Sequence, residues 1–121
     1  MKSKPRKPKR PKHWTAGLDE NAVSDALAEA VVDAHDDDEQ HTGLLALIED
    51  EMKFPFKARV MGEEIVVTGM EWPEDDSFGL DLICKRSGGS FRVEARSVEL
   101  LAPFPEGHLR LAAYLDWKKR M

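Results

Sequence analysis

The sequence predicts an α+β fold in which two N-terminal helices, a small five-stranded antiparallel SH3-like barrel and a C-terminal helix form one domain. Apolar residues recur at helical spacing up to Pro55, alternate with polar residues as far as Phe104, and return to near-helical spacing at the C-terminus. A change of hydrophobic period from about 3.6 to 2 marks a change from helix to strand. With 121 residues, the chain can bury a single modest core.

The two N-terminal helices are predicted from caps and apolar spacing. The first begins near Asp19 to Asn21, since either residue can cap a helix. Its apolar positions are Val23, Leu27, Ala30, Val31 and Ala34. The second begins at Asp36, with Glu39 three residues later completing a capping box, and Pro55 ends it. Its apolar positions are Leu44, Leu45, Leu47, Ile48 and Met52.

The middle of the chain is predicted to form the barrel. Alternating apolar residues indicate four strands, at residues 54–60, 65–70, 78–82 and 91–95. The last two are joined by a hairpin with two glycines at its tip. A short turn then leads to a fifth strand over residues 100–104, an order typical of an SH3-like barrel closed so that few edges remain exposed. The C-terminal helix is expected around residues 109–117.

Charge divides the chain into a basic tail and an acidic body. Residues 1–12 hold seven of the 18 basic side chains and no acidic one, so the rest has a net charge of −12. Residues 1–18 are predicted to be a disordered tail rich in proline, lysine and arginine, and residues 19–121 a single globular domain. Residues 1–12 are the part suited to nucleic acid or an acidic partner, although such a tail can also serve only for solubility.

Several classes of protein are disfavoured by the sequence. It has no segment apolar enough for a membrane span or a secretory signal, so a cytoplasmic protein is expected, most simply a monomer. One cysteine, Cys84, cannot form an internal disulfide or a cysteine-cluster zinc site, and it is expected to be a buried apolar residue. Because motifs of phosphate-binding loops, nucleophile elbows and paired metal-binding histidines are missing, we expect no enzymatic activity.

Two acidic segments are the candidate functional residues. They comprise Asp33, Asp36, Asp37, Asp38 and Glu39 around the start of the second helix, and Glu74, Asp75 and Asp76 between two strands. Calcium takes about six to eight oxygen ligands, so a small domain must bring several carboxylates together. Consecutive helical side chains diverge by about 100°, which means that one segment alone is a poor site. Each segment also has a structural interpretation, as a charged first helical turn or as an ordinary polar turn.

Neither segment is an EF-hand loop. Such a loop needs glycine at its sixth position and glutamate at its twelfth. Counting from Asp36 places His41 and Leu47 at these positions, and counting from Glu74 places Gly79 and Lys85 there. A calcium site in this chain must therefore be assembled from separate elements, and we expect the helix start and the later loop to form its two halves.

A series of short motifs runs through the globular part of the chain. The most specific is Phe54-Pro55-Phe56-Lys57-Ala58-Arg59, followed by Gly69-Met70 with Pro73-Glu74-Asp75. The others are Val31-Val32-Asp33-Ala34, the Asp36–Gln40 stretch, Glu49-Asp50 and Gly62-Glu63-Glu64. In order and spacing, over roughly residues 22–117, these motifs resemble the small acidic calcium-binding proteins of the CcbP type. The basic tail has no counterpart in that pattern.

The resemblance implies a compact α+β body that binds or buffers calcium in the cytoplasm through acidic sites other than EF-hands. Together with the acidic segments, it makes a non-enzymatic calcium-binding protein the leading hypothesis, with Ca²⁺ as the ligand. The alternative is an SH3-like interaction module whose basic N-terminal arm contacts nucleic acid or an acidic partner.

Overall fold

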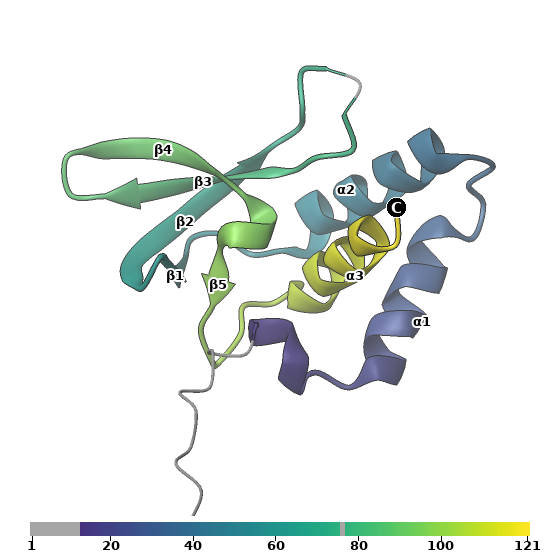
Figure 1. The fold of residues 1–121 in the computed structure, drawn as a ribbon, viewed down its shortest axis with the longest axis horizontal. Helices are drawn as coiled ribbons and strands as arrows, with labels where there is room; N and C mark the ends of the chain where they lie inside the picture. The colour runs from purple at the N-terminus through teal and green to yellow at the C-terminus, as the bar shows by residue number, and fades with distance from the viewer. Residues whose placement is uncertain (1–12, 76) are drawn as a thin grey trace, which may run out of the picture.

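The computed structural model describes residues 13–75 and 77–121 (Figure 1). The basic arm of residues 1–12, with its predicted disorder and nucleic-acid contact, and Asp76 lie outside the described residues. The helical elements are the 3-10 helices η1 (Trp14–Gly17) and η2 (Ala95–Ser97) and the α-helices α1 (Glu20–Val31), α2 (Asp37–Glu51) and α3 (His108–Lys119). The strands are β1 (Phe56–Val60), β2 (Glu63–Glu71), β3 (Asp81–Arg86), β4 (Gly89–Glu94) and β5 (Glu99–Leu100).

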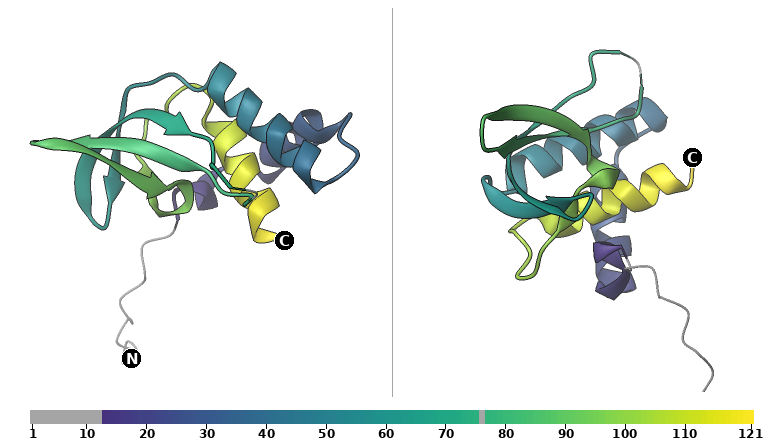
Figure 2. Two further views of the ribbon diagram at one scale, coloured as in Figure 1. Left: turned by 90° about the horizontal axis from the view of Figure 1, so that it is seen from above. Right: turned by 60° about the vertical axis from the view of Figure 1, so that its left-hand side comes forward.

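The predicted α+β fold class is confirmed. Five antiparallel strands form one sheet in the order β4-β3-β2-β1-β5, and the three α-helices gather on one side of it (Figures 1 and 2). The apolar core lies between them. Its fully buried members come from both parts and include Leu44 and Ile48 of α2, Val67 and Leu82 of the sheet, and Tyr114 of α3. None of the described helices is long and apolar enough to cross a membrane.

The sheet is open where the sequence predicts a closed barrel. Strands β4 and β5 are its two edges, and β5 pairs only with Ala58 and Arg59 of β1. The predicted fifth strand over residues 100–104 therefore ends at Leu100. Pro103 and Pro105 have no N–H to donate to a ladder, which explains the early end.

Order also begins earlier than the predicted boundary near Asp19. The segment Trp14–Gly17 forms η1, and the Trp14 side chain is buried against the ring of Phe104. Residues 13–18 thus belong to the folded body, which corrects the predicted extent of the tail. A single large aromatic after a basic, proline-rich stretch is a weak signal, and hydrophobic periodicity does not register it.

Both predicted helix caps are present. Asp19 Oδ1 accepts a hydrogen bond from Asn21 N at 2.9 Å, and Asp36 Oδ1 accepts one from Glu39 N at 2.8 Å. The capping box is displaced by one residue, because Glu39 Oε2 accepts from His35 N at 2.8 Å instead of from Asp36 N. The first turn of α2 is therefore fixed by two carboxylates before any ligand is considered.

Arg110 of α3 joins the three helices. Its Nε donates to Glu51 Oε2 of α2 at 2.8 Å, and its Nη2 donates to Glu29 Oε1 of α1 at 2.8 Å. Nη1 also donates to the carbonyl of Ala26 at 3.1 Å, and the side chain is only 12% exposed. A guanidinium with several fixed donors suits such a junction, so the end of α2 and the middle of α1 are both held by α3.

Cys84 is fully buried in β3, as predicted, and burial raises the pKa of its thiol. Because the thiolate is the reactive form, alkylation must await an opening of the sheet. We expect a thiol reagent to modify the native protein roughly 100-fold or more slowly than the urea-unfolded protein. A comparison of the two rates by mass spectrometry checks this, and similar rates would contradict it.

Candidate functional site

The first acidic segment lies at the junction of α1 and α2. A shallow hollow with a volume of about 550 Å³ separates the two helices there, and the acidic residues that line it are Glu29, Asp33, Asp38 and Glu39. The floor is narrow because α1 and α2 approach closely. A Cβ added at Gly43 would stand 2.7 Å from the carbonyl oxygen of Ala30. The fold thus places carboxylates from two helices around one hollow.

The carboxylates of this segment differ in how far they are already engaged. Asp36 and Glu39 each use one oxygen to cap α2. Among the described residues, Asp33, Asp37 and Asp38 have neither a side-chain hydrogen-bond partner nor an ion pair, and all three are exposed. The dipole of α2 stabilises these charges, so a cation here must compete with the helix N-terminus.

The second segment lies in the connection between β2 and β3, which we name the acidic loop (residues 72–75 and 77–80). Glu74 and Asp75 are exposed, and Asp76 is not described. Asp75 Oδ1 accepts a hydrogen bond from Ser77 N at 3.0 Å. Hydrogen bonds from the Ser77 side chain and backbone lower the pKa of Asp75, so this carboxylate is ionised at neutral pH.

Side chains of the helices hold both ends of the acidic loop. At its start, Trp72 Nε1 donates to Glu49 Oε2 of α2 at 2.6 Å. At its end, His41 Nε2 of α2 lies 2.9 Å from the carbonyl oxygen of Gly79, and the Tyr114 hydroxyl of α3 donates to the carbonyl of Phe78 at 3.0 Å. The loop is therefore fastened to the helical layer and not only to its two strands.

The burial of His41 and its hydrogen bond to the acidic loop were not predicted from the sequence. Its side chain is only 7% exposed and contacts the rings of both Phe78 and Trp117. A signal for burial was available, because residue 41 stands three and four positions before Leu44 and Leu45 on the apolar face of α2. Phe78 differs from the prediction for a related reason, since it enters this aromatic cluster and β3 begins only at Asp81.

The described residues do not bring the two acidic segments together as one group. Among residues 13–75 and 77–121, no three His, Cys, Asp or Glu side chains are placed to hold a metal ion. Asp33, Asp38 and Glu39 share the hollow between α1 and α2, whereas Glu74 and Asp75 do not line it. The assignment of all eight predicted ligands to one site therefore stays a prediction.

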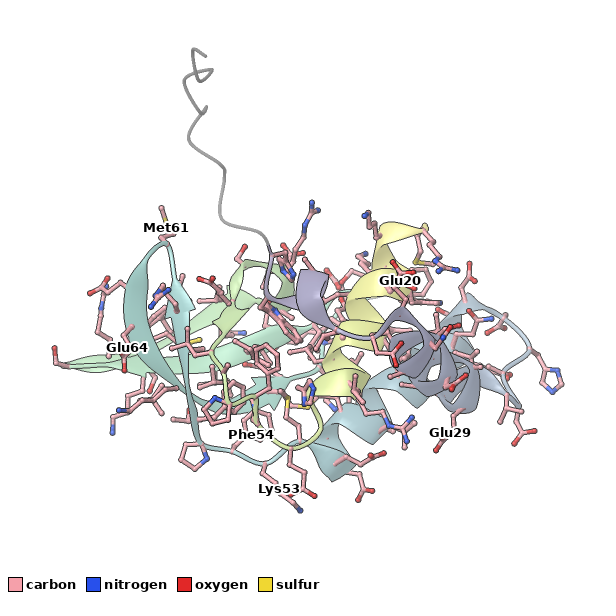
Figure 3. All side chains as sticks on the ribbon, turned by 90° about the horizontal axis from the view of Figure 1, so that it is seen from below. Glu20, Glu29, Lys53, Phe54, Met61 and Glu64 are labelled. Carbon is pink, nitrogen blue, oxygen red and sulfur yellow. The ribbon has the colours of Figure 1, made fainter. Side chains whose placement is uncertain are left out.

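Other acidic side chains lie outside the two predicted segments. Figure 3 shows Glu29, which also lines the hollow between α1 and α2, on the helical part and Glu64 on the sheet. At the end of α2, Glu49 and Glu51 already accept hydrogen bonds from Trp72 and Arg110. These two carboxylates have structural partners, which leaves the two predicted segments as the better sources of calcium ligands.

A larger hollow, of about 840 Å³, lies where η1 and α1 face α3. Its rim carries both signs of charge, for example Glu20 and Asp116 beside Lys118 and Lys119. None of the seven predicted ligands that the structure describes lines it. Because lysines repel a cation, the size of this hollow does not make it the candidate site.

Part of the chain matches a known protein family. Residues 26–80 match the model of the CcbP family, which is described as calcium binding. This segment of the chain is therefore similar to the CcbP family. The stretch that matches contains all eight predicted ligands, and it ends where the acidic loop meets β3.

Two solved structures share the CcbP fold with this chain. The crystal structure of Anabaena CcbP is 20% identical, with a TM-score of 0.66, and the alignment covers 86% of this chain and 94% of that one. A calcium binding protein in its calcium-binding form is 21% identical, with a TM-score of 0.63, and the alignment covers 84% of this chain and 92% of that one. A comparison with curated proteins finds no significant match.

Proposed function

We propose that this protein is a member of the CcbP family and a non-enzymatic protein that binds or buffers calcium through exposed carboxylates of its two acidic segments. The observation that supports the proposal most directly is that the stretch matching the CcbP family is also the most acidic part of the chain. The matching stretch, residues 26–80, holds 15 of the 23 acidic residues but only three of the 18 basic ones. The part of the chain that carries the family resemblance is thus also the part richest in oxygen ligands.

The donors fit a hard cation. In the helix start, Asp33, Asp37 and Asp38 would supply exposed carboxylates that pair with no other side chain among residues 13–75 and 77–121. In the acidic loop, Glu74 is available, and Asp75 is ionised with one oxygen turned to Ser77. Calcium accepts carboxylates in flexible arrangements, and it relieves the repulsion among like charges that are close together.

The exposed positions of the acidic side chains favour binding in which the acidic loop adjusts around the ion. No described group of three acidic side chains is preformed, so ligands must be gathered from exposed positions. Gathering them costs conformational entropy, and this cost is smaller where a segment is already held at its ends. The acidic loop satisfies this condition, since it is fastened at Trp72, Phe78 and Gly79.

Calcium is expected to stabilise the folded protein. A ligand that binds only the native state adds about 2.7 kcal/mol to the free energy of unfolding when its free concentration is 100 times Kd. Thermal unfolding with and without calcium measures this, and calorimetric titration in excess magnesium measures selectivity. If millimolar calcium produced neither binding heat nor a rise in Tm, the proposed function would be wrong.

A further inference from the structure

We propose that His41 and Tyr114 are positioning residues that hold the end of the acidic loop, so that less of the loop has to be ordered when its carboxylates gather around a cation. The inference rests on the proposed calcium binding, and it assigns two residues outside the acidic segments to that function. Neither residue needs to contact the ion. Both act through consecutive backbone carbonyls, those of Phe78 and Gly79.

The first argument concerns backbone hydrogen bonding. Phe78 and Gly79 precede β3, so no partner strand is paired with them. Partly buried carbonyls require donors, because leaving one unpaired costs the desolvation of that group. Here the donors are side chains from two different helices, the Nε2 of His41 at 2.9 Å and the hydroxyl of Tyr114 at 3.0 Å. The end of the loop is thus fixed to α2 and α3 together.

The second argument concerns the orientation of the donors. The His41 ring stacks on Trp117, with the ring centroids 5.9 Å apart and an interplanar angle of 20°. Trp117 is held in turn, since its Nε1 donates to Gln40 Oε1 at 2.8 Å. Because a carbonyl only accepts, His41 must carry its proton on Nε2. The imidazole is therefore fixed as a donor and is not free to serve as a metal ligand through this nitrogen.

The third argument concerns Phe78 itself. Its ring meets His41 edge-on with centroids 5.6 Å apart, and it meets Trp117 edge-on at 5.7 Å. Aromatic contact and the Tyr114 hydrogen bond thus hold the same residue by its side chain and by its carbonyl. By contrast, the exposed Asp75 side chain accepts a local hydrogen bond from Ser77 N within the loop. The exposed carboxylates of Glu74 and Asp75 thus precede a loop end that the helices hold in place.

The consequence is a link between the aromatic cluster and calcium affinity. When one donor is lost, the loop end becomes free to move, and binding must then order it. Tyr114→Phe removes one hydroxyl and keeps the ring. His41→Phe removes the donor and keeps an aromatic ring, whereas His41→Gln supplies an amide N–H in place of Nε2. We expect the two Phe variants each to weaken calcium binding roughly two- to tenfold, and His41→Gln to retain most of the affinity.

The experiment uses the full chain and calorimetric titration with calcium chloride at a temperature where every variant is folded. Val60→Ala in β1 is the control, because it removes core packing at the end of the strand that pairs with Glu63, away from both acidic segments. Its affinity should equal that of the unmodified protein. Equal affinity for the two Phe variants and the unmodified protein would overturn the inference.

A second measurement needs no calcium. The amide of Ala95 donates to the carbonyl of Leu80 at 2.9 Å, so its hydrogen exchange reports whether the loop end is in place. Exchange at Ala95 should be faster in Tyr114→Phe and His41→Phe than in Val60→Ala at matched stability. If the unmodified protein failed to bind calcium, the proposed function would fail, and this exchange measurement would still decide whether the two donors hold the loop.

Discussion

Neutralising Glu74 and Asp75 together, as Glu74→Gln with Asp75→Asn, is expected to weaken calcium binding by roughly 100-fold. Both carboxylates are exposed in the acidic loop, and the pKa of Asp75 is lowered by its hydrogen bonds to Ser77. The amides keep the size and the hydrogen bonding of the side chains, so the change removes charge from the loop with little effect on the fold. Calorimetric titration gives both the affinity and the number of ions.

A matched control is available in β2. Glu63→Gln with Glu64→Gln makes the same change in net charge at the other end of that strand, where the two carboxylates pair with Arg86 and Lys57. Its effect on affinity should stay within about threefold, since distant exposed charges are screened by salt. Equal losses in both pairs would mean that only net charge matters and that the loop is not a source of ligands.

The helix start can be tested against the loop in the same assay. Asp37→Asn with Asp38→Asn leaves the capping residue Asp36 intact. If both segments serve one ion, the two double variants share an interaction energy and the number of ions is unchanged. If each segment serves its own ion, each double variant lowers the number of ions bound. This comparison decides what the described geometry leaves as a prediction.

Gly107→Ala is expected to have the largest effect on stability, with a loss of about 3–5 kcal/mol in the free energy of unfolding. Gly107 precedes α3 with a φ of 88°, and an added Cβ would stand 2.6 Å from Met52 Cα and 2.7 Å from Met52 N. These are backbone atoms, so a rotamer change cannot relieve the contact. The start of α3 would have to separate from the end of α2.

Urea unfolding followed by circular dichroism measures this loss. Gly17→Ala is the control, because an added Cβ there meets nothing within 4 Å and the φ of Gly17 is not positive. Its stability should change by less than about 0.5 kcal/mol. A similarly small effect for Gly107→Ala would contradict the close approach of α2 and α3.

Local features of the fold could be predicted because they depend on neighbouring residues. Asp19 and Asp36 can be recognised as caps because each is a capping residue directly before a helical pattern. The hairpin between β3 and β4 follows from its glycines. Features set by distant partners could not be predicted. Phe78 alternates like a strand residue, yet it packs in the aromatic cluster with His41. The same applies to Trp14, whose partner Phe104 lies about 90 residues away in sequence.

The candidate site divides in the same way. The kind of ligand follows from composition, since carboxylates gathered in two segments indicate a hard cation. The relative placement of the two segments depends on the direction in which the acidic loop continues from β2. A register shift between Val67 and Gly69 changes the pairing of β2 with β3 shortly before this loop. Alternation of apolar residues does not reveal such an irregularity. The eight residues could therefore be chosen by type but not arranged in space.

The hydrogen bond between Trp72 and Glu49 gives the protein an optical probe of its own. Trp14 and Trp117 are each 7% exposed, whereas Trp72 is 36% exposed and stands at the start of the acidic loop. Trp72 is therefore the exposed indole and the one that stands next to Glu74 and Asp75 in sequence, whereas Trp14 and Trp117 are buried. Changes near Glu74 and Asp75 can consequently be followed by intrinsic fluorescence, without attaching a dye to the acidic loop.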